Sequence, residues 1–558
     1  MTKLTGQIGN LGTALYKTRY IFVFLTLISF WGQTPMWIGS WAQGINWLLI
    51  GVAQSVILSL MIGLPWLVVR ILGWIGAALI TTLSVVNVVA WWQWGFGLSN
   101  KMFIIILQTN SHEAFGFLSE LWNCILIILH HPLFWTALIG TAILTLVIRW
   151  MGQHTYYALV GIVTIGSLIC TARQVYICGI EEHGRKQISL ILRTAVDLKT
   201  TLAVVPMTEA AKAEFRSHMP QVPQLVCEEV TDNLIFVIGE SSSAKHWSVF
   251  GYALPTTAGL DAMSDSLLLF ANTLPPAHTT AEVLSMVLTE KNSTTHTREW
   301  SDYVDVIRLV HTAGYKTSWF SNQEKCGIYT GCIPILADCA DTCCYMNLFC
   351  DDDLEQTKPD GILLPALKQL MSDNIGTKQF AIFHTMGSHA PYKYHYPKDF
   401  ARFAPEDYKG IRDTDRLSAT QLKMISEYDN AIAYTDYFLT EMIKTFSQYE
   451  GRNLLIYFSD HSEEVYDIDD FFGHARRKPY VKVPMIIWAS EAWRTANAEL
   501  WGRLQGAINK PIATENTIHL FHSLLGIKSE LYDETLDFSS AAYDEGRERY
   551  FDGKIYEE

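Results

Sequence analysis

The order of hydrophobic and polar residues divides the chain into two unlike parts. Residues 20–178 are rich in Leu, Ile, Val, Trp and Gly and carry few charges, whereas the chain from about residue 180 has the mixed composition of a globular protein. A helix that crosses a bilayer needs roughly 20 mostly apolar residues. The first part therefore predicts about five membrane spans, at Tyr20–Ile38, Trp47–Val68, Leu72–Trp92, within Leu121–Ile148, and at Tyr157–Cys178.

Positive charges in the short loops predict how these spans are oriented. They occur before the first span, between the second and third, and after the fourth, at Lys3, Lys17, Arg19, Arg70 and Arg149. With five spans all of them fall on one side, which the positive-inside rule makes cytoplasmic. An odd number of spans then places residues 180–558 in the periplasm of a Gram-negative cell, anchored in its inner membrane. Six spans would reverse this placement.

The second part alternates apolar strands with helical stretches, which predicts an α/β domain with a largely parallel sheet between helices. Predicted strands are Leu234–Ile238, Ser266–Ala271, Thr317–Phe320, Gln379–Phe383, Leu454–Phe458 and Val483–Trp488. Predicted helices include Thr280–Leu288, Ile362–Met371 and Leu417–Phe446.

Three regions follow from these patterns. A transmembrane domain occupies residues 1–179, and the α/β domain occupies residues 225–558. Residues 180–224 between them are charged and helix-prone, then proline-rich. This bridge is either an amphipathic helix lying along the membrane or a plain linker.

Charge and cysteine content narrow the classes of function. The formal net charge of −14 over 558 residues argues against a nucleic-acid partner. Six cysteines crowd into one stretch, at Cys326, Cys332, Cys339, Cys343, Cys344 and Cys350. In an oxidising compartment they predict a loop held by up to three disulfides. A structural zinc knuckle is the alternative, although the spacings lack the paired C-x2-C of zinc ribbons.

Chemically active side chains follow several predicted strands. Asp460 and His461 come directly after one strand, with His474 further along, and Glu240 follows another. Carboxylates and imidazoles at the carboxyl ends of strands suit a zinc site, because open α/β sheets bind ligands at that edge. The alternative is a solvated acidic loop with a capping Asp. His389 also follows a strand, which favours a shared site.

Two threonines precede an apolar helical run. Thr279 or Thr280 could cap the helix, or one hydroxyl could lie beneath a phosphoryl group, since helix N-termini attract phosphate. A threonine hydroxyl becomes a nucleophile only when a metal or a base activates it. Simpler hydrolase patterns are absent from the sequence: G-x-S-x-G, the Walker A pattern and H-E-x-x-H do not occur.

One loop between the third and fourth spans is polar. Gln108-Thr-Asn110-Ser-His-Glu113-Ala reads either as a capped helix start or as a site for the amine head group of a lipid.

Together these motifs resemble the bacterial phosphoethanolamine transferases of the alkaline phosphatase and sulfatase superfamily, over nearly the whole chain. The matching segments are Gln108–Ala114, Gly239-Glu240-Ser, Phe250-Gly-Tyr, Thr280, Trp319-Phe-Ser-Asn-Gln323, Ser388-His389-Ala-Pro, Tyr428–Asp436, Ser459-Asp460-His461-Ser-Glu463 and Gly473-His474.

The resemblance implies a role for each matching residue. Zinc is held by Glu240, Thr280, Asp460 and His461, and Thr280 is also the nucleophile. The remaining roles are substrate contacts: His389 and His474 hold the phosphoryl group or a second zinc and take part in catalysis, Asn322 contacts the phosphoethanolamine group, and Asn110 and Glu113 bind the donor lipid.

The implied reaction transfers phosphoethanolamine from phosphatidylethanolamine to an envelope acceptor through a covalent threonine intermediate. Members that act on lipid A have Cys-Gly-Thr-Ala-Thr-Ala at the nucleophile, where this chain reads Pro276-Ala-His-Thr-Thr-Ala281. The expected acceptor is the lipopolysaccharide core, lipid A or a periplasmic glucan, and this departure makes lipid A the least favoured of the three. We also expect a monomeric enzyme. Thr279 is the alternative nucleophile. A phosphoglycerol transferase, a phosphodiesterase and a non-catalytic membrane binding protein are the alternative functions.

Overall fold

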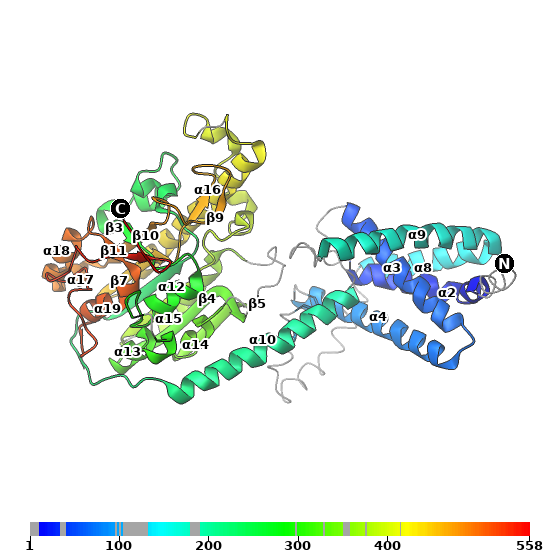
Figure 1. The fold of residues 1–558 in the computed structure, drawn as a ribbon, viewed down its shortest axis with the longest axis horizontal. Coiled ribbons are helices and arrows are strands. Elements are labelled where there is room, and N and C mark those ends of the chain that lie inside the picture. Colours follow the sequence, from blue (N-terminus) through cyan, green and yellow to red (C-terminus); the bar gives the residue numbers. More distant parts are fainter. Residues whose placement is uncertain are drawn as a thin grey trace. The chain divides into compact units, whose positions relative to one another are not determined.

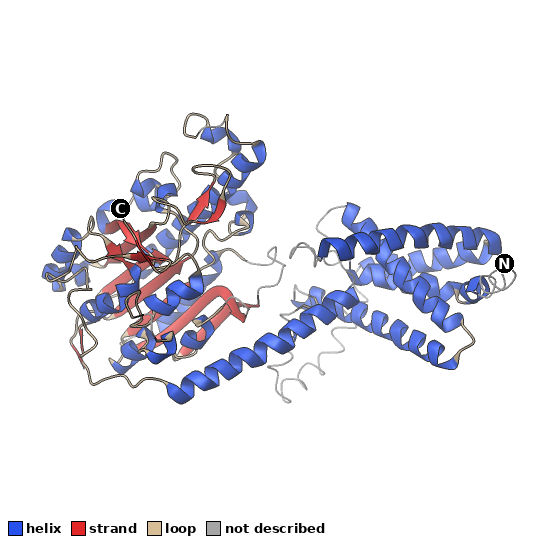
Figure 2. Ribbon diagram, viewed as in Figure 1, coloured by secondary structure: helices blue, strands red, loops and turns tan. Residues whose placement is uncertain are grey.

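The computed structural model describes residues 11–33, 41–94, 97–99, 102–103, 132–178, 190–295, 298–326, 330–349, 358–373, 376–412 and 415–557. The chain forms two compact units, Met1–Val205 and Pro206–Glu558 (Figure 1). The first is helical, and the second combines a sheet with helices (Figure 2). Helix α10 (Leu190–His218) passes from one unit into the other within the predicted bridge, and the three predicted domain limits stay a prediction.

Helices occupy all five ranges in which membrane spans are predicted. They are α2 (Arg19–Gln33), α3 (Trp41–Gly63), α4 (Leu67–Trp94), α8 (Pro132–Trp150) and α9 (Gln153–Cys178). By length and composition, Leu67–Trp91 is long and apolar enough to cross a membrane among the described residues, and the bent pair Leu11–Lys17 and Arg19–Gln33 would make a second. The five-span topology therefore stays a prediction.

The helical unit has an inverted distribution of polarity. Its surface carries large apolar side chains, with Trp66, Val68 and Ile162 between 65% and 72% exposed. Its interior holds polar ones: Ser55 and Asn87 are buried, and the Asn87 amide donates to the carbonyl of Gly32 at 2.8 Å. Apolar surface with buried polar side chains such as that of Asn87 hydrogen-bonded inside is the pattern that a hydrocarbon solvent favours.

The second unit is built on an eight-stranded sheet, which confirms the predicted α/β fold. The strand order is β11-β3-β10-β7-β2-β6-β4-β5, and β10 is antiparallel to both its neighbours while the other pairs are parallel. The strands are β2 (Asn233–Gly239), β3 (Leu267–Leu274), β4 (Lys316–Cys326), β5 (Thr342–Phe349), β6 (Gln379–His384), β7 (Asn453–Ser459), β10 (Val483–Ala489) and β11 (Ile512–Ala513).

Helices cover both faces of this sheet. Alternate residues of β2 enter two different cores, since Phe236 packs in one hydrophobic cluster and Val237 in the other. Burial on both faces explains why the central strands read as unbroken apolar runs. The first cluster includes residues of α12 (Thr280–Val287), α13 (Val306–Thr312), α14 (Ile333–Ala337), α17 (Glu491–Ala496), α18 (Ala498–Gly506) and α19 (Thr517–Leu525). The second includes residues of α11 (Ala258–Asp261), α15 (Leu364–Asp373) and α16 (Ala419–Phe446).

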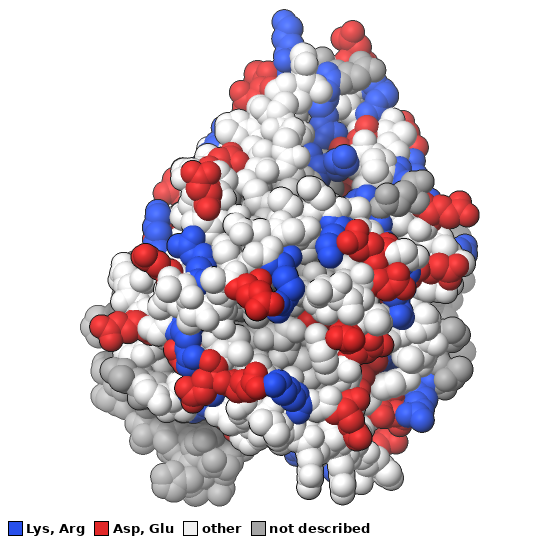
Figure 3. Space-filling model, turned by 90° about the vertical axis from the view of Figure 1, so that its left-hand side faces the viewer, with Lys and Arg blue, Asp and Glu red and all other residues white. Residues whose placement is uncertain are grey.

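Short paired strands lie outside the main sheet. They are β1 (Val226–Cys227) with β12 (Ile527–Lys528), β8 (Glu463–Val465) with β9 (Phe472–His474), and β13 (Tyr550–Phe551) with β14 (Lys554–Ile555). On the face of this unit shown in Figure 3, Lys and Arg are interspersed with Asp and Glu, as on an ordinary water-exposed surface.

Among the described residues, the cysteine-rich stretch contains no disulfide of the kind that the sequence predicts. Cys332, Cys339, Cys343 and Cys344 are free thiols, and the side chains of Cys326 and Cys350 lie outside the described residues. Cys332 packs beside α14, whereas Cys343 and Cys344 are consecutive residues of β5. Consecutive strand residues point to opposite faces of a sheet, so the thiols of Cys343 and Cys344 are held apart from each other by the strand.

Candidate metal centre

The carboxyl ends of neighbouring parallel strands bring the predicted ligands together. Strand β2 ends at Gly239 and delivers Glu240, while its neighbour β7 ends at Ser459 and delivers Asp460 and His461. All three ligand residues are at most 1% exposed. One ligand atom of each lies within 4.8 Å of the others. This trio confirms that the predicted residues meet at one edge of the sheet.

Thr280, the first residue of α12, points its hydroxyl at this trio. Its Oγ1 donates to Glu240 Oε2 at 3.2 Å and lies 3.4 Å from His461 Nε2. Thr279 is the N-cap residue, and its side chain makes no capping hydrogen bond. The structure therefore places the Thr280 hydroxyl against the candidate ligands.

His461 lies beside two carboxylates, and all three side chains are buried from solvent. Its Nε2 lies 3.2 Å from Glu240 Oε1 and 3.5 Å from Asp460 Oδ2. Burial lowers the pKa of His461, but the two carboxylates outweigh it and raise that pKa to about 10. The imidazolium in turn holds the pKa of Glu240 well below its usual range against the effect of burial. Burial and the Glu240 charge raise the pKa of Asp460 to about 7.

One carboxylate oxygen of Asp460 is available to bind a cation. Its Oδ1 accepts from the backbone N–H groups of Ser241 and His461, at 3.2 and 2.6 Å. Its Oδ2 is buried and has no hydrogen-bond partner. Unpaired buried oxygens are costly, and metal coordination is one way to satisfy them. Two carboxylates, one imidazole and a hydroxyl also match the ligand chemistry of zinc.

Close backbone packing fixes Glu240 in place. Gly387, with φ of +47°, lies so near that a Cβ atom there would be 2.7 Å from the Glu240 carbonyl oxygen. The Ser388 hydroxyl donates to the carbonyls of Glu240 and Ser241, at 3.2 and 3.0 Å. The loop after β6 therefore holds the backbone that carries the carboxylate.

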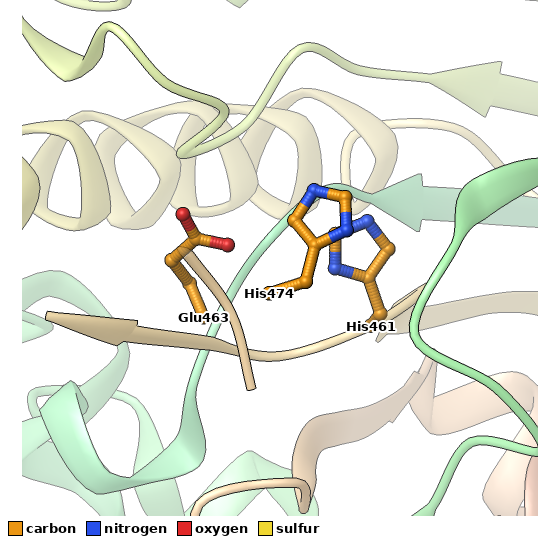
Figure 4. Close-up of side chains that lie close together, drawn as sticks. All are labelled: His461, Glu463 and His474. Atoms are coloured by element: carbon orange, nitrogen blue, oxygen red, sulfur yellow. The ribbon is translucent and has the colours of Figure 1, made fainter. Parts of the chain in front are cut away.

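A second group of ligand-type side chains adjoins the first. His461, Glu463 and His474 also bring one ligand atom each within 4.8 Å of one another (Figure 4). The rings of His461 and His474 are 4.3 Å apart. Glu463 accepts from the Tyr392 hydroxyl at 2.9 Å through Oε1, while its buried Oε2 has no partner.

The second group differs from the first in protonation. Burial, followed by the neighbouring His461 charge, lowers the pKa of His474 to about 4. Burial raises the pKa of Glu463 to about 8. At neutral pH, His474 therefore has a free nitrogen lone pair with which to bind a metal or a proton.

The remaining predicted contacts fall in three places. His389 follows β6 and points its Nδ1 at the Ala390 carbonyl, 2.6 Å away, which leaves Nε2 for a ligand. The Asn322 amide is buried and donates to the Lys358 carbonyl and to Asp360. Asn110 and Glu113 lie outside the described residues, so their predicted role stays a prediction.

Two residues that contact the site were not predicted as site residues. Gln323 donates its amide to Glu240 Oε2 at 3.0 Å and to the Thr385 carbonyl at 2.9 Å. Glu463 completes the second ligand group. Both belong to motifs noted in the sequence, and the position of Glu463 two residues after His461 was a signal that could have identified it.

Comparison with known proteins agrees with this geometry. A model of the sulfatase family matches residues 232–527, more than half of the chain. The chain belongs to the sulfatase family. The matched segment contains every described ligand of both groups, from Glu240 to His474.

Several relatives of this sulfatase-family chain are named phosphoethanolamine transferases. EptC of Escherichia coli O18:K1:H7 is 29% identical over 313 residues, which cover 54% of this chain and 52% of EptC. CptA of Salmonella typhimurium is 27% identical, over 60% of this chain and 56% of CptA. The chain thus spans about half the length of the relatives it matches.

Among solved structures, the C-terminal periplasmic domain of Escherichia coli EptC in complex with zinc is similar. It has 26% sequence identity and a TM-score of 0.54, and the match covers 60% of this chain and 94% of that domain. The similarity supports the sulfatase-type α/β fold of the second unit.

Proposed function

We propose that this protein is a zinc-dependent phosphoethanolamine transferase of a bacterial inner membrane. It would move phosphoethanolamine from phosphatidylethanolamine to an envelope glycolipid or glycan in the periplasm. One observation carries the proposal: the Thr280 hydroxyl lies 3.2 Å from Glu240 and 3.4 Å from His461, within a buried set of ligand-type side chains. The names of the EptC and CptA relatives support the transferred group.

Zinc would be held by Glu240, Asp460, His461 and the Thr280 hydroxyl. The unpaired Asp460 oxygen and the zinc complex of the similar EptC domain support this assignment. When bound, zinc supplies Lewis acidity that lowers the pKa of a coordinated hydroxyl and offsets charge on phosphoryl oxygens. Gln323 and Ser241 donate hydrogen bonds to the Glu240 carboxylate, at 3.0 and 2.7 Å, and so keep it in position.

In the first half of the reaction, the Thr280 oxygen attacks the phosphorus of the donor lipid. The Thr280 hydroxyl gives its proton to a neighbouring imidazole, that of His389 or His474, and the bond from phosphorus to the diacylglycerol oxygen breaks. The same imidazole then protonates the diacylglycerol oxygen. In the second half, an acceptor hydroxyl gives its proton to that imidazole and its oxygen attacks phosphoethanolamine-Thr280. The bond from phosphorus to the Thr280 oxygen breaks, and the imidazole returns the proton to that oxygen. Both transfers pass through a charged phosphoryl group that the adjoining imidazoles stabilise.

A membrane location follows from the donor and from the helical unit. Phosphatidylethanolamine keeps its acyl chains in the bilayer while its head group lies at the interface. The exposed apolar surface of α4 and α9, together with the polar interior of this unit, fits helices surrounded by lipid. We propose five spans with the sulfatase-fold unit outside, and a monomer as the active form.

The test is incubation of the purified full chain with phosphatidylethanolamine or phosphatidylglycerol, each labelled in the head group. We expect label from phosphatidylethanolamine on a Thr280 peptide by mass spectrometry, and onward transfer to lipopolysaccharide. Label from phosphatidylglycerol instead would identify a phosphoglycerol transferase. Release of head group without any labelled peptide would indicate a phosphodiesterase, and no turnover with zinc bound would overturn catalysis.

A further inference from the structure

A chain of three side chains from distant segments lies beside the second ligand group. His278, two residues before Thr280, points its Nδ1 at Asp552, 2.7 Å from Oδ1. On the other side of the ring, Arg476 donates from Nη2 to His278 Nε2 at 2.8 Å. A guanidinium can only donate, so Nε2 must accept and the ring proton lies on Nδ1, where it is donated to Asp552.

Asp552 is itself held rigidly. It occupies the turn between β13 and β14, and its backbone N–H donates to the Pro276 carbonyl at 2.8 Å. Its Oδ1 also accepts from the His278 backbone N–H at 3.2 Å. The hairpin thus clamps the segment that leads into Thr280, and the fixed imidazole orients the guanidinium of Arg476.

Arg476 differs from the two basic residues that follow it. Arg477 is paired with Glu464 and Asp469. Lys478 lies over the Tyr556 ring at 4.7 Å. Arg476 is exposed, and among the described residues its hydrogen-bond partner is the unprotonated Nε2 of His278 rather than a carboxylate. Most of its five N–H donors, and its full charge, therefore remain for a ligand.

Arg476 is placed to contact the acceptor molecule rather than the phosphorus that is transferred. The His278 ring is 6.2 Å from the His474 ring, which is in turn 4.3 Å from His461. The guanidinium thus lies two imidazoles away from His461, at the exposed rim of the site. A group bound there belongs to the molecule that approaches Thr280 from solvent.

We propose that Arg476, oriented by His278 and Asp552, binds a phosphate group on the acceptor and so determines acceptor specificity. This inference rests on the proposed transferase function. A guanidinium fork matches phosphate oxygens in a bidentate arrangement. Phosphate is favoured over carboxylate because an exposed pair of single charges contributes little, whereas a phosphate monoester carries nearly two.

The test compares two acceptors: purified lipopolysaccharide, and the same material after hydrofluoric acid has removed its phosphates. Transfer from labelled phosphatidylethanolamine is measured with the full-length wild type, Arg476→Gln, Arg476→Lys and the neighbouring control Lys478→Gln. We expect Arg476→Gln to lower kcat/KM for the phosphorylated acceptor about tenfold, mainly through KM, with less than about twofold change for the dephosphorylated one. Arg476→Lys should retain part of the preference, and Lys478→Gln should retain all of it.

Each other outcome is decisive. Equal loss with both acceptors would mean that Arg476 only supports the fold, and an unchanged kcat/KM with both would mean that it does not contact phosphate. If the wild type uses only the phosphorylated acceptor, the same KM for wild type and Arg476→Gln would give the second answer. Each of these results overturns this inference alone. If the wild type moves no head group to either acceptor, the proposed function itself is overturned, and this inference with it.

Discussion

The Thr280 hydroxyl oxygen lies 3.2 Å from the Glu240 carboxylate, although 40 residues separate them in the chain. Glu240 directly follows β2, one of the two central strands of the sheet, and Thr280 begins a helix packed on that sheet. A nucleophile and a metal ligand are thus fixed on two rigid elements, as catalytic geometry requires.

Replacing Thr280 should abolish transfer while leaving three of the four proposed zinc ligands in place. We expect Thr280→Ala to lower the rate by at least about 1,000-fold, because the covalent step loses its nucleophile. Thr279→Ala is the matched control and should stay within about threefold of wild type, since the Thr279 side chain makes no capping hydrogen bond. Head-group transfer and zinc content are the measurements. Equal activity of Thr280→Ala and wild type would contradict the assigned nucleophile.

Removing one carboxylate should weaken metal binding. Asp460→Asn replaces the buried, unpaired oxygen with a neutral group, so we expect zinc affinity to fall about 100-fold or more in a chelator competition. The control Asp470→Asn removes an exposed acid ten residues further along and should leave affinity unchanged. Equal affinities for the two variants would place the metal elsewhere.

Zinc affinity should rise with pH between about 6 and 9. In the metal-free site the carboxylates raise the pKa of His461 to about 10, so a proton occupies the imidazole and zinc must displace it. Each proton released gives about a tenfold rise in affinity per pH unit. Below pH 7 the raised pKa of Asp460 adds a second proton and steepens the slope. Calorimetry in buffers of different ionisation enthalpy counts these protons, and a pH-independent affinity would contradict the prediction.

A methyl group at Gly387 should displace the backbone of Glu240 and so weaken zinc binding. Gly387→Ala brings a Cβ within 2.7 Å of the Glu240 carbonyl and also strains a positive φ. Gly376→Ala is a matched control, because φ is +80° there and nothing lies within 4 Å. We expect the control to cost about 1 kcal/mol and Gly387→Ala clearly more, with weaker zinc binding only in the latter. Thermal unfolding and zinc titration of both variants would show the difference.

Glu324 should make stability depend on pH. Burial raises its pKa to about 7 from an ordinary 4.5, and its Oε2 has no partner. The folded chain therefore holds this proton more tightly than the unfolded chain, so the contribution is full below pH 4.5 and is lost as pH rises through 7. Glu324→Gln should gain about 1–3 kcal/mol relative to wild type at pH 8 and little at pH 4.5. Denaturant unfolding at both values tests this, and an equal effect at the two pH values would exclude Glu324 as the cause.

The sequence alone predicted that Glu240, Asp460 and His461 lie together, because the central strands are apolar on both faces and their polar residues begin where each strand ends. Parallel pairing then forces Glu240, Asp460 and His461 to one edge. The tertiary structure decided the side-chain contacts that no local sequence pattern predicts. The pairing of β4 with β5 is irregular between Ser321 and Glu324, where Asn322 and Gln323 have different partners. The described residues Cys343 and Cys344 lie in β5 as free thiols. His278 meets Asp552, 274 residues away, only because the hairpin folds back beside Pro276, and side-chain partners at such separation depend on packing rather than on pattern.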